Sequence, residues 1–209
     1  MPRSAAVIAP IAVVAALCAR APAARAGSAT DAVRSANDTM SRLLRAKVTP
    51  GSPAEKKRAE QVVDRLRSFL DIDELGRAAL ADHWGSLTDA QKKEYLQLLR
   101  ALIEANYVKG LRARLDYRVV YTGESAKGDR VVVSTEVRTK RKGRPVSIGI
   151  DYVLRREGAG ESSWRAVDVV TDGVGLVENY RAQFNRIIQK EGFDGLLARM
   201  RKKLAAERK

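Results

Sequence analysis

Residues 131–155, VVVSTEVRTKRKGRPVSIGIDYVLR, contain the alternation that decides the fold class. On both sides of a basic segment at 140–144, every second residue is apolar, aromatic or a threonine. Such alternation is typical of half-buried β-strands. It predicts strands over 131–139 and 145–155, joined by a hairpin with a basic tip.

Two further strands are expected beside this hairpin. Residues 117–122 and 163–171 have the same period of two, and turn-forming segments at 123–129 and 158–161 connect them to it. Short turns between consecutive strands predict an antiparallel meander. The alternation indicates one covered face and one face toward water.

Apolar residues at steps of three and four predict helices on both sides of the strands. Thr88-Asp89-Ala90-Gln91 is a capping-box pattern at the start of the strongest helix. Gly192 is a candidate C-cap, and Trp84 is expected in a turn closed by Gly85. The expected helices cover residues 31–47, 54–70, a short stretch after Asp71, 88–111, and one segment on each side of Gly192.

Helices, then strands, then helices predict an α+β protein. We expect a curved four-stranded antiparallel sheet of the NTF2-like or cystatin-like type, with helices before and after it enclosing an apolar pocket. The sheet is expected over about 115–172, and the helical lobe over about 30–114 and 174–206.

The first residues have the order of a secretory signal. A short basic segment at 1–3 precedes an uncharged, mostly apolar stretch at 5–17, and small residues flank Arg25. We expect a signal peptide over 1–26, cleaved near Ala26, and export to the periplasm. The alternative, an uncleaved anchor, is disfavoured because the apolar stretch is shorter than the roughly 20 residues that span a bilayer. The only cysteine, Cys18, lies inside this signal.

The formal net charge of the chain is +14. In a cytosolic protein such an excess would indicate nucleic-acid binding. Export excludes that partner and leaves membrane head groups and acidic proteins as anionic surfaces. A solvated basic surface without a specific partner is the alternative.

The residues that carry chemistry are sparse. His83 is the only histidine, so we expect no metal site and no cofactor. One enzymatic hypothesis remains, with Asp168 as a base in a pocket shared with Asp151, Tyr152 and Tyr107. The alternative is that Asp168 is a structural carboxylate paired with cations or backbone amides.

Two stretches carry a family resemblance. The first is IDELGRAALADHW at 72–84, continued by LTDAQKKEYLQLL at 87–99; the second is WRAVDVVTDGVGLVENYR at 164–181. Together they resemble the signature regions of the MlaC (toluene-tolerance) family of periplasmic phospholipid-shuttle proteins. This chain has Gly175 at a position where the family usually has serine.

The resemblance implies an MlaC-like lipid-binding domain over 27–209 that is not an enzyme. MlaC-like proteins hold acyl chains in a deep pocket between helices and a curved sheet. They carry phospholipid between an outer-membrane lipoprotein–porin complex and an inner-membrane ABC transporter with a lipid-binding ring, which maintains outer-membrane lipid asymmetry. Two alternatives are a small-molecule enzyme on a similar sheet and an envelope adaptor that binds no lipid.

A lipid carrier needs apolar walls around its cargo. The basic hairpin is the candidate for contact with head groups or a partner protein, through Lys140, Arg141, Lys142 and Arg144. The apolar residues available for the walls are Phe69, Leu80, Trp84, Leu99, Ile103, Tyr107, Val133, Val137, Ile148, Ile150, Trp164, Val167, Val169, Val174, Leu176 and Tyr180.

Overall fold

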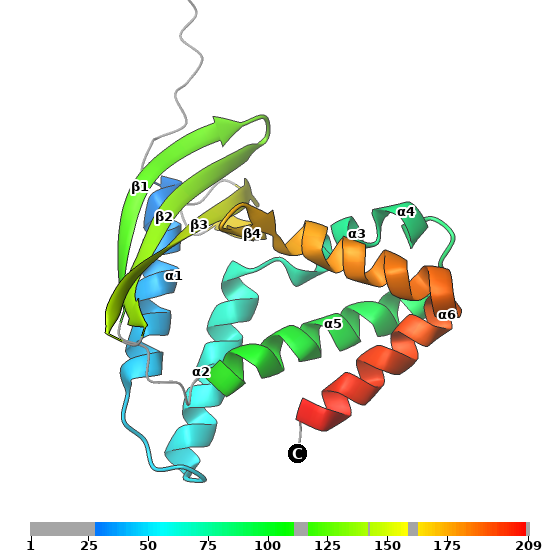
Figure 1. Cartoon of the computed structure of the whole chain (residues 1–209), viewed down its shortest axis with the longest axis horizontal. Coiled ribbons are helices and arrows are strands. Elements are labelled where there is room, and N and C mark those ends of the chain that lie inside the picture. The colour runs from blue at the N-terminus through cyan, green and yellow to red at the C-terminus, as the bar shows by residue number, and fades with distance from the viewer. Residues whose placement is uncertain (1–27, 111–116, 142, 159–162, 208–209) are drawn as a thin grey trace, which may run out of the picture.

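The protein is described by a computed structural model that covers residues 28–110, 117–141, 143–158 and 163–207. The expected signal peptide over 1–26 and Lys142 lie outside these ranges. The architecture is α+β, as expected, with an antiparallel sheet beside a helical lobe (Figure 1).

Side-chain caps mark the start of several of the helices before the sheet. The Ser52 side chain accepts a hydrogen bond from the Glu55 amide, and Asp71 accepts one from the Glu74 amide. Trp84 ends a one-turn helix rather than lying in a turn, because the amides of His83 and Trp84 both donate to the carbonyl oxygen of Leu80. These helices are α1 (Ser28–Arg45), α2 (Pro53–Phe69), α3 (Ile72–Ala79), α4 (Ala81–Trp84) and α5 (Asp89–Gly110).

The capping box at the start of α5 is present. The Thr88 hydroxyl accepts a hydrogen bond from the Gln91 amide, and the Gln91 side chain accepts one from the Thr88 amide. After the sheet, α6 (Leu176–Glu207) is broken at Gly192, whose φ is 69°. Glycine adopts this left-handed conformation readily, and the break folds the second half of α6 back toward α5 (Figure 1).

The sheet has five strands rather than the four expected. Asp172 and Gly173 both have positive φ, as in the tight hairpin turns favoured by Asp-Gly, and this turn adds the short fifth strand. The order follows the chain and every neighbouring pair is antiparallel. The strands are β1 (Tyr117–Lys127), β2 (Arg130–Arg141), β3 (Arg144–Arg156), β4 (Trp164–Thr171) and β5 (Val174–Gly175).

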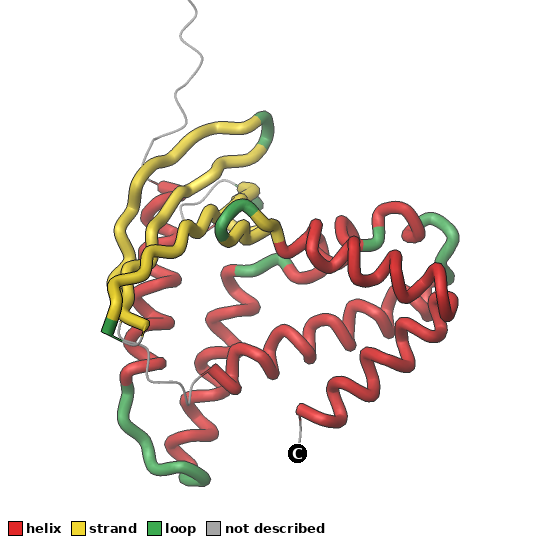
Figure 2. The backbone as a smooth tube through the Cα atoms, viewed as in Figure 1, coloured by secondary structure: helices red, strands yellow, loops and turns green. Residues whose placement is uncertain are grey.

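The first hairpin is longer than the sequence indicated. Residues 123–127 were expected in a turn, yet they pair with β2, as in the pair Glu124 and Val133. Thr122 is an extra residue in this ladder, and Val167 is an extra residue in β4. Such bulges bend strands, and Figure 2 shows the sheet curving over α1.

Two apolar cores hold the molecule together. The larger one joins α2, α3, α5 and α6 around residues such as Leu75, Tyr95 and Leu196. The smaller one joins the first turns of α1 to the sheet through residues such as Val33, Val133 and Leu154. The concave face of the sheet is therefore covered at one end by the beginning of α1.

We predict that Gly76→Ala destabilises the protein by about 1–3 kcal/mol, the usual cost of overpacking. A Cβ at position 76 would lie 2.8 Å from methyl groups of Leu96 and Leu99 where α3 meets α5. Gly85→Ala is the control, because nothing lies within 4 Å of its Cβ position. Urea denaturation should show a lower midpoint for Gly76→Ala only; equal midpoints would contradict this tight helix contact.

Candidate functional site

A cavity of about 500 Å³ lies between α1, α2, the end of α5 and the concave face of the sheet. Its volume is typical of sites that enclose small ligands, which occupy about 300–1,000 Å³. Most of the lining is aliphatic or aromatic. The lining residues are Ala36, Asn37, Met40, Leu44, Arg65, Leu66, Phe69, Leu70, Asn106, Tyr107, Tyr117, Val119, Val137, Thr139, Ile148, Ile150, Tyr152 and Val169.

The sheet wall of the cavity follows from strand register. Val119, Val137 and Ile148 are neighbours across β1, β2 and β3, and Tyr152 pairs with Val169 farther along. Side chains at alternate positions share a face, so this wall continues the face that α1 covers at Val133. Toward the hairpin tip the same face is only partly covered, and its apolar side chains border the cavity instead.

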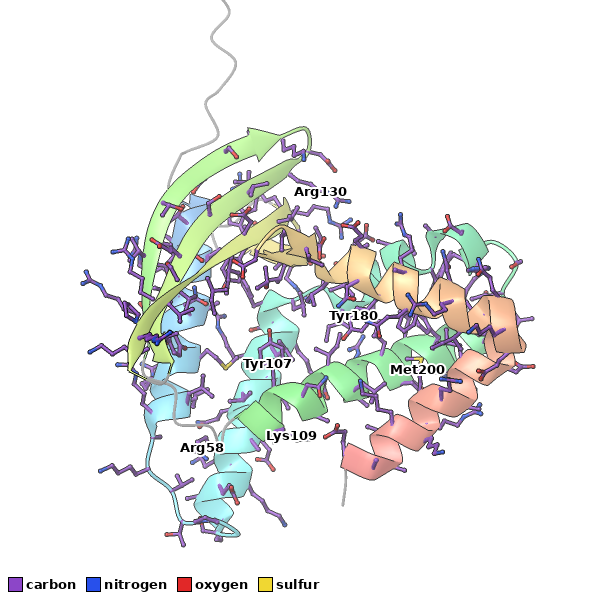
Figure 3. The ribbon with its side chains drawn as sticks, in the orientation of Figure 1. Arg58, Tyr107, Lys109, Arg130, Tyr180 and Met200 are labelled. Atoms are coloured by element: carbon purple, nitrogen blue, oxygen red, sulfur yellow. The ribbon has the colours of Figure 1, made fainter. Side chains whose placement is uncertain are left out.

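The helical wall includes Tyr107, near the end of α5. Tyr107 is 40% exposed and lines the cavity, and Figure 3 shows it beside α2. Burial raises the pKa of Tyr107, and nearby Tyr180 adds to the shift. Burial also raises the pKa of Tyr152, although a hydrogen bond with Asn37 lowers it. Loss of solvation disfavours the charged phenolate in both cases.

A polar seam joins α1 to the sheet beside the cavity. The Tyr152 hydroxyl donates to the Asn37 side chain at 3.0 Å, and the Asn37 amide donates to the Tyr121 hydroxyl at 3.3 Å. The hydroxyls of Ser41 and Tyr117 lie 2.9 Å apart. These contacts satisfy polar groups that the cavity would otherwise leave without partners.

On the other side of this seam lies a basic groove of about 710 Å³ between α1 and β1. It shares Asn37, Tyr117, Val119 and Thr139 with the cavity. Its cationic lining residues are Arg34, Arg45, Arg118, Arg138 and Lys140. An apolar cavity therefore adjoins a cationic groove.

Six of the sixteen expected wall residues line the cavity: Phe69, Tyr107, Val137, Ile148, Ile150 and Val169. The other ten lie elsewhere, because they face the two cores or solvent rather than the uncovered part of the sheet. Leu80, Leu99 and Ile103 are in the larger core, with Trp84, Leu176 and Tyr180 packed against it; Val133 and Trp164 are in the smaller core; Val167 is buried on β4, and Val174 is 57% exposed.

The sequence reasoning missed the contribution of α1. Ala36, Met40 and Leu44 recur every fourth residue and line the cavity, and this spacing was a signal that could have identified them. The basic hairpin was expected at the site. Lys140 lines the groove, Arg144 pairs with Arg141 at the strand ends, and Lys142 lies outside the described residues.

The carboxylate of Asp168, the base of the enzymatic hypothesis, has a structural role. It accepts hydrogen bonds from the amides of Val169 and Val177 at 2.8 and 3.1 Å, and so caps the start of α6. A Cβ at Gly175 would lie 2.7 Å from the same carboxylate, which accounts for glycine at that position. Asp168 does not line the cavity.

The last features to consider are the single histidine, metal ligands and membrane-spanning helices. The His83 ring lies 3.0 Å from the Asn185 side-chain oxygen. Within the described ranges, no three His, Cys, Asp or Glu side chains cluster as metal ligands would. No helix in the described part of the chain has the length and apolar character needed to cross a bilayer.

Comparison with known proteins identifies relatives of this chain. The family model described as MlaC protein matches residues 34–202. The intermembrane phospholipid transport system binding protein MlaC of Haemophilus influenzae is 22% identical over 135 residues, which are 65% of this chain and 63% of that protein. The chain thus aligns with less than two thirds of this curated relative.

A solved structure has the same fold. It is a phospholipid-binding protein from Ralstonia solanacearum in complex with a phospholipid. The TM-score is 0.69 at 23% sequence identity, and the match covers 87% of this chain and 99% of the other.

We predict that Tyr107→Phe leaves stability at neutral pH unchanged and reduces the loss of stability in alkali. The raised pKa of Tyr107 means that, above the ordinary tyrosine pKa of about 10, the unfolded chain loses this proton before the folded protein does. Stability therefore falls as pH rises through that range. Thermal melts between about pH 9 and 11 should decline less steeply in the variant; identical slopes would show that Tyr107 is freely solvated.

Proposed function

This chain belongs to the MlaC family, and on that premise we propose that it is a periplasmic carrier that binds phospholipid acyl chains in the cavity beneath its sheet. The observation that carries the proposal is a wall of apolar side chains, including Val137, Ile148 and Phe69, that borders a cavity of about 500 Å³. The names of the H. influenzae relative and the R. solanacearum neighbour, which both refer to phospholipid, support the same cargo.

The energetics of the cavity suit such a cargo. Each CH₂ group removed from water contributes about 0.8 kcal/mol, so a sixteen-carbon chain contributes on the order of 10 kcal/mol before the costs of binding. The acyl chains of a single lipid in water stay exposed, and an apolar cavity removes them from water. The polar and charged residues of the lining, Asn37, Arg65 and Asn106, are not fully buried, so they leave a place for the head group at the edge of the apolar walls.

The carrier exchanges its cargo with membrane complexes on both sides of the periplasm in this proposal. Its partners are an inner-membrane ABC transporter with a lipid-binding ring and an outer-membrane lipoprotein–porin complex. The net charge of +14 and the cationic groove support contact with anionic head groups or acidic protein surfaces. In the basic hairpin, Lys140 is the residue with a place in that groove.

Native mass spectrometry of protein purified from the periplasm tests the cargo. We expect a stoichiometric phospholipid adduct that solvent extraction identifies. Removing it should lower the melting temperature, because a ligand at a hundred times its Kd stabilises the folded state by about 2.7 kcal/mol. A bare polypeptide that takes up no lipid from vesicles would instead favour an enzyme or an adaptor.

We predict that Val137→Glu reduces bound phospholipid by more than tenfold. The variant places a carboxylate in the apolar wall between Val119 and Ile148, and an unpaired charge there costs several kcal/mol. Val132→Glu is the matched control, since Val132 lies on the opposite face of the same strand and does not line the cavity. Equal lipid content in the two folded variants would refute the placement of the acyl chains.

A further inference from the structure

Arg65, on α2, has the one charged side chain among the described residues that line the cavity. Its Nε is buried and has no hydrogen-bond partner. Its terminal nitrogens reach only the hydroxyls of Ser68 and Ser35, each at 3.4 Å. Within the described ranges, no carboxylate lies within the 4.0 Å that would make an ion pair with it.

Comparison with other arginines shows that a guanidinium without a carbonyl or carboxylate partner is unusual among those with a buried Nε. Four more arginines in the described part of the chain have a buried Nε without a partner. Each of them is anchored through a terminal nitrogen to a carbonyl or carboxylate oxygen. The distances are 2.5 Å for Arg58, 3.1 Å for Arg155, 3.2 Å for Arg165 and 2.6 Å for Arg181.

The surroundings of Arg65 favour an anionic partner. Its guanidinium lies 5.9 Å from the ring of Phe69, another cavity residue. Burial lowers the pKa of Arg65, which means that the site disfavours the cation in its present surroundings. Arg65 is half-buried, so it lies where the apolar cavity meets solvent, and an anion there would compensate for the lost hydration.

We propose that the guanidinium of Arg65 binds the phosphate of the carried phospholipid. This inference rests on the proposed function and adds the head group to it. The planar fork of a guanidinium donates two parallel hydrogen bonds to phosphate oxygens, and the 3.4 Å contacts to Ser35 and Ser68 are weak enough to be replaced. The phosphate then lies at the side of the cavity formed by α1 and α2, with the acyl chains against the sheet.

Arg65→Gln tests this contact with two lipids that have the same chains. Delipidated protein is incubated with vesicles containing either dipalmitoyl phosphatidylglycerol or dipalmitoylglycerol, which lacks phosphate, and bound lipid is measured by native mass spectrometry. We expect Arg65→Gln to weaken binding of the phosphatidylglycerol about tenfold, equivalent to roughly 1.4 kcal/mol. Binding of the dipalmitoylglycerol should not change.

Two further variants sharpen the test. Arg65→Lys keeps the charge but loses the fork, so its binding of phosphatidylglycerol should lie between that of the wild type and Arg65→Gln. Lys57→Gln removes a charge from an exposed position of the same helix, outside the cavity lining, and should bind both lipids like the wild type.

Several outcomes would overturn the inference. Equal losses for both lipids would mean that Arg65 supports the cavity rather than the phosphate, and unchanged binding would mean that it contacts neither. In both cases the wild type still takes up phospholipid and the proposed function stands. A wild-type protein that takes up neither lipid would remove the proposed function as well.

Discussion

The curvature of the sheet is the constraint on which the rest of the structure depends. Long antiparallel strands with extra residues at Thr122 and Val167 bend into a concave surface. A straight helix cannot follow that surface over its full length. The start of α1 packs into it at Val33, while Met40 and Leu44 of the later turns line the cavity.

The separation of two cores gives this arrangement its stability. The larger core is formed mainly by helices, with Ala166 of β4. The smaller core holds the start of α1 against the sheet. Because neither core includes Val137 or Ile148, these residues can present apolar surface to a ligand without weakening the packing that maintains the fold.

Much of the fold could be predicted from the sequence, because alternation and capping are local signals. The period of two around 131–155 identified the central hairpin, and Thr88 and Gln91 marked the start of α5. The fifth strand was missed although Asp172-Gly173 is a hairpin signal. The site was harder to predict, because Val133 and Val137 have the same pattern on one strand, and only the path of α1 makes the first a core residue and the second a cavity residue.

The polar seam determines how the cavity and the basic groove are kept apart. The residues that line both are Asn37, Tyr117, Val119 and Thr139, and hydrogen bonds join Asn37 to Tyr152 and Ser41 to Tyr117. Hydrogen bonds of this kind contribute only about 0.5–1.5 kcal/mol each, because water replaces them when they break. Two of the seam residues, Tyr121 and Tyr152, also pack against the smaller core, so the polar contacts continue directly into apolar packing. The seam therefore places a line of exchangeable polar contacts between the cavity and the basic groove, next to the core that holds the start of α1.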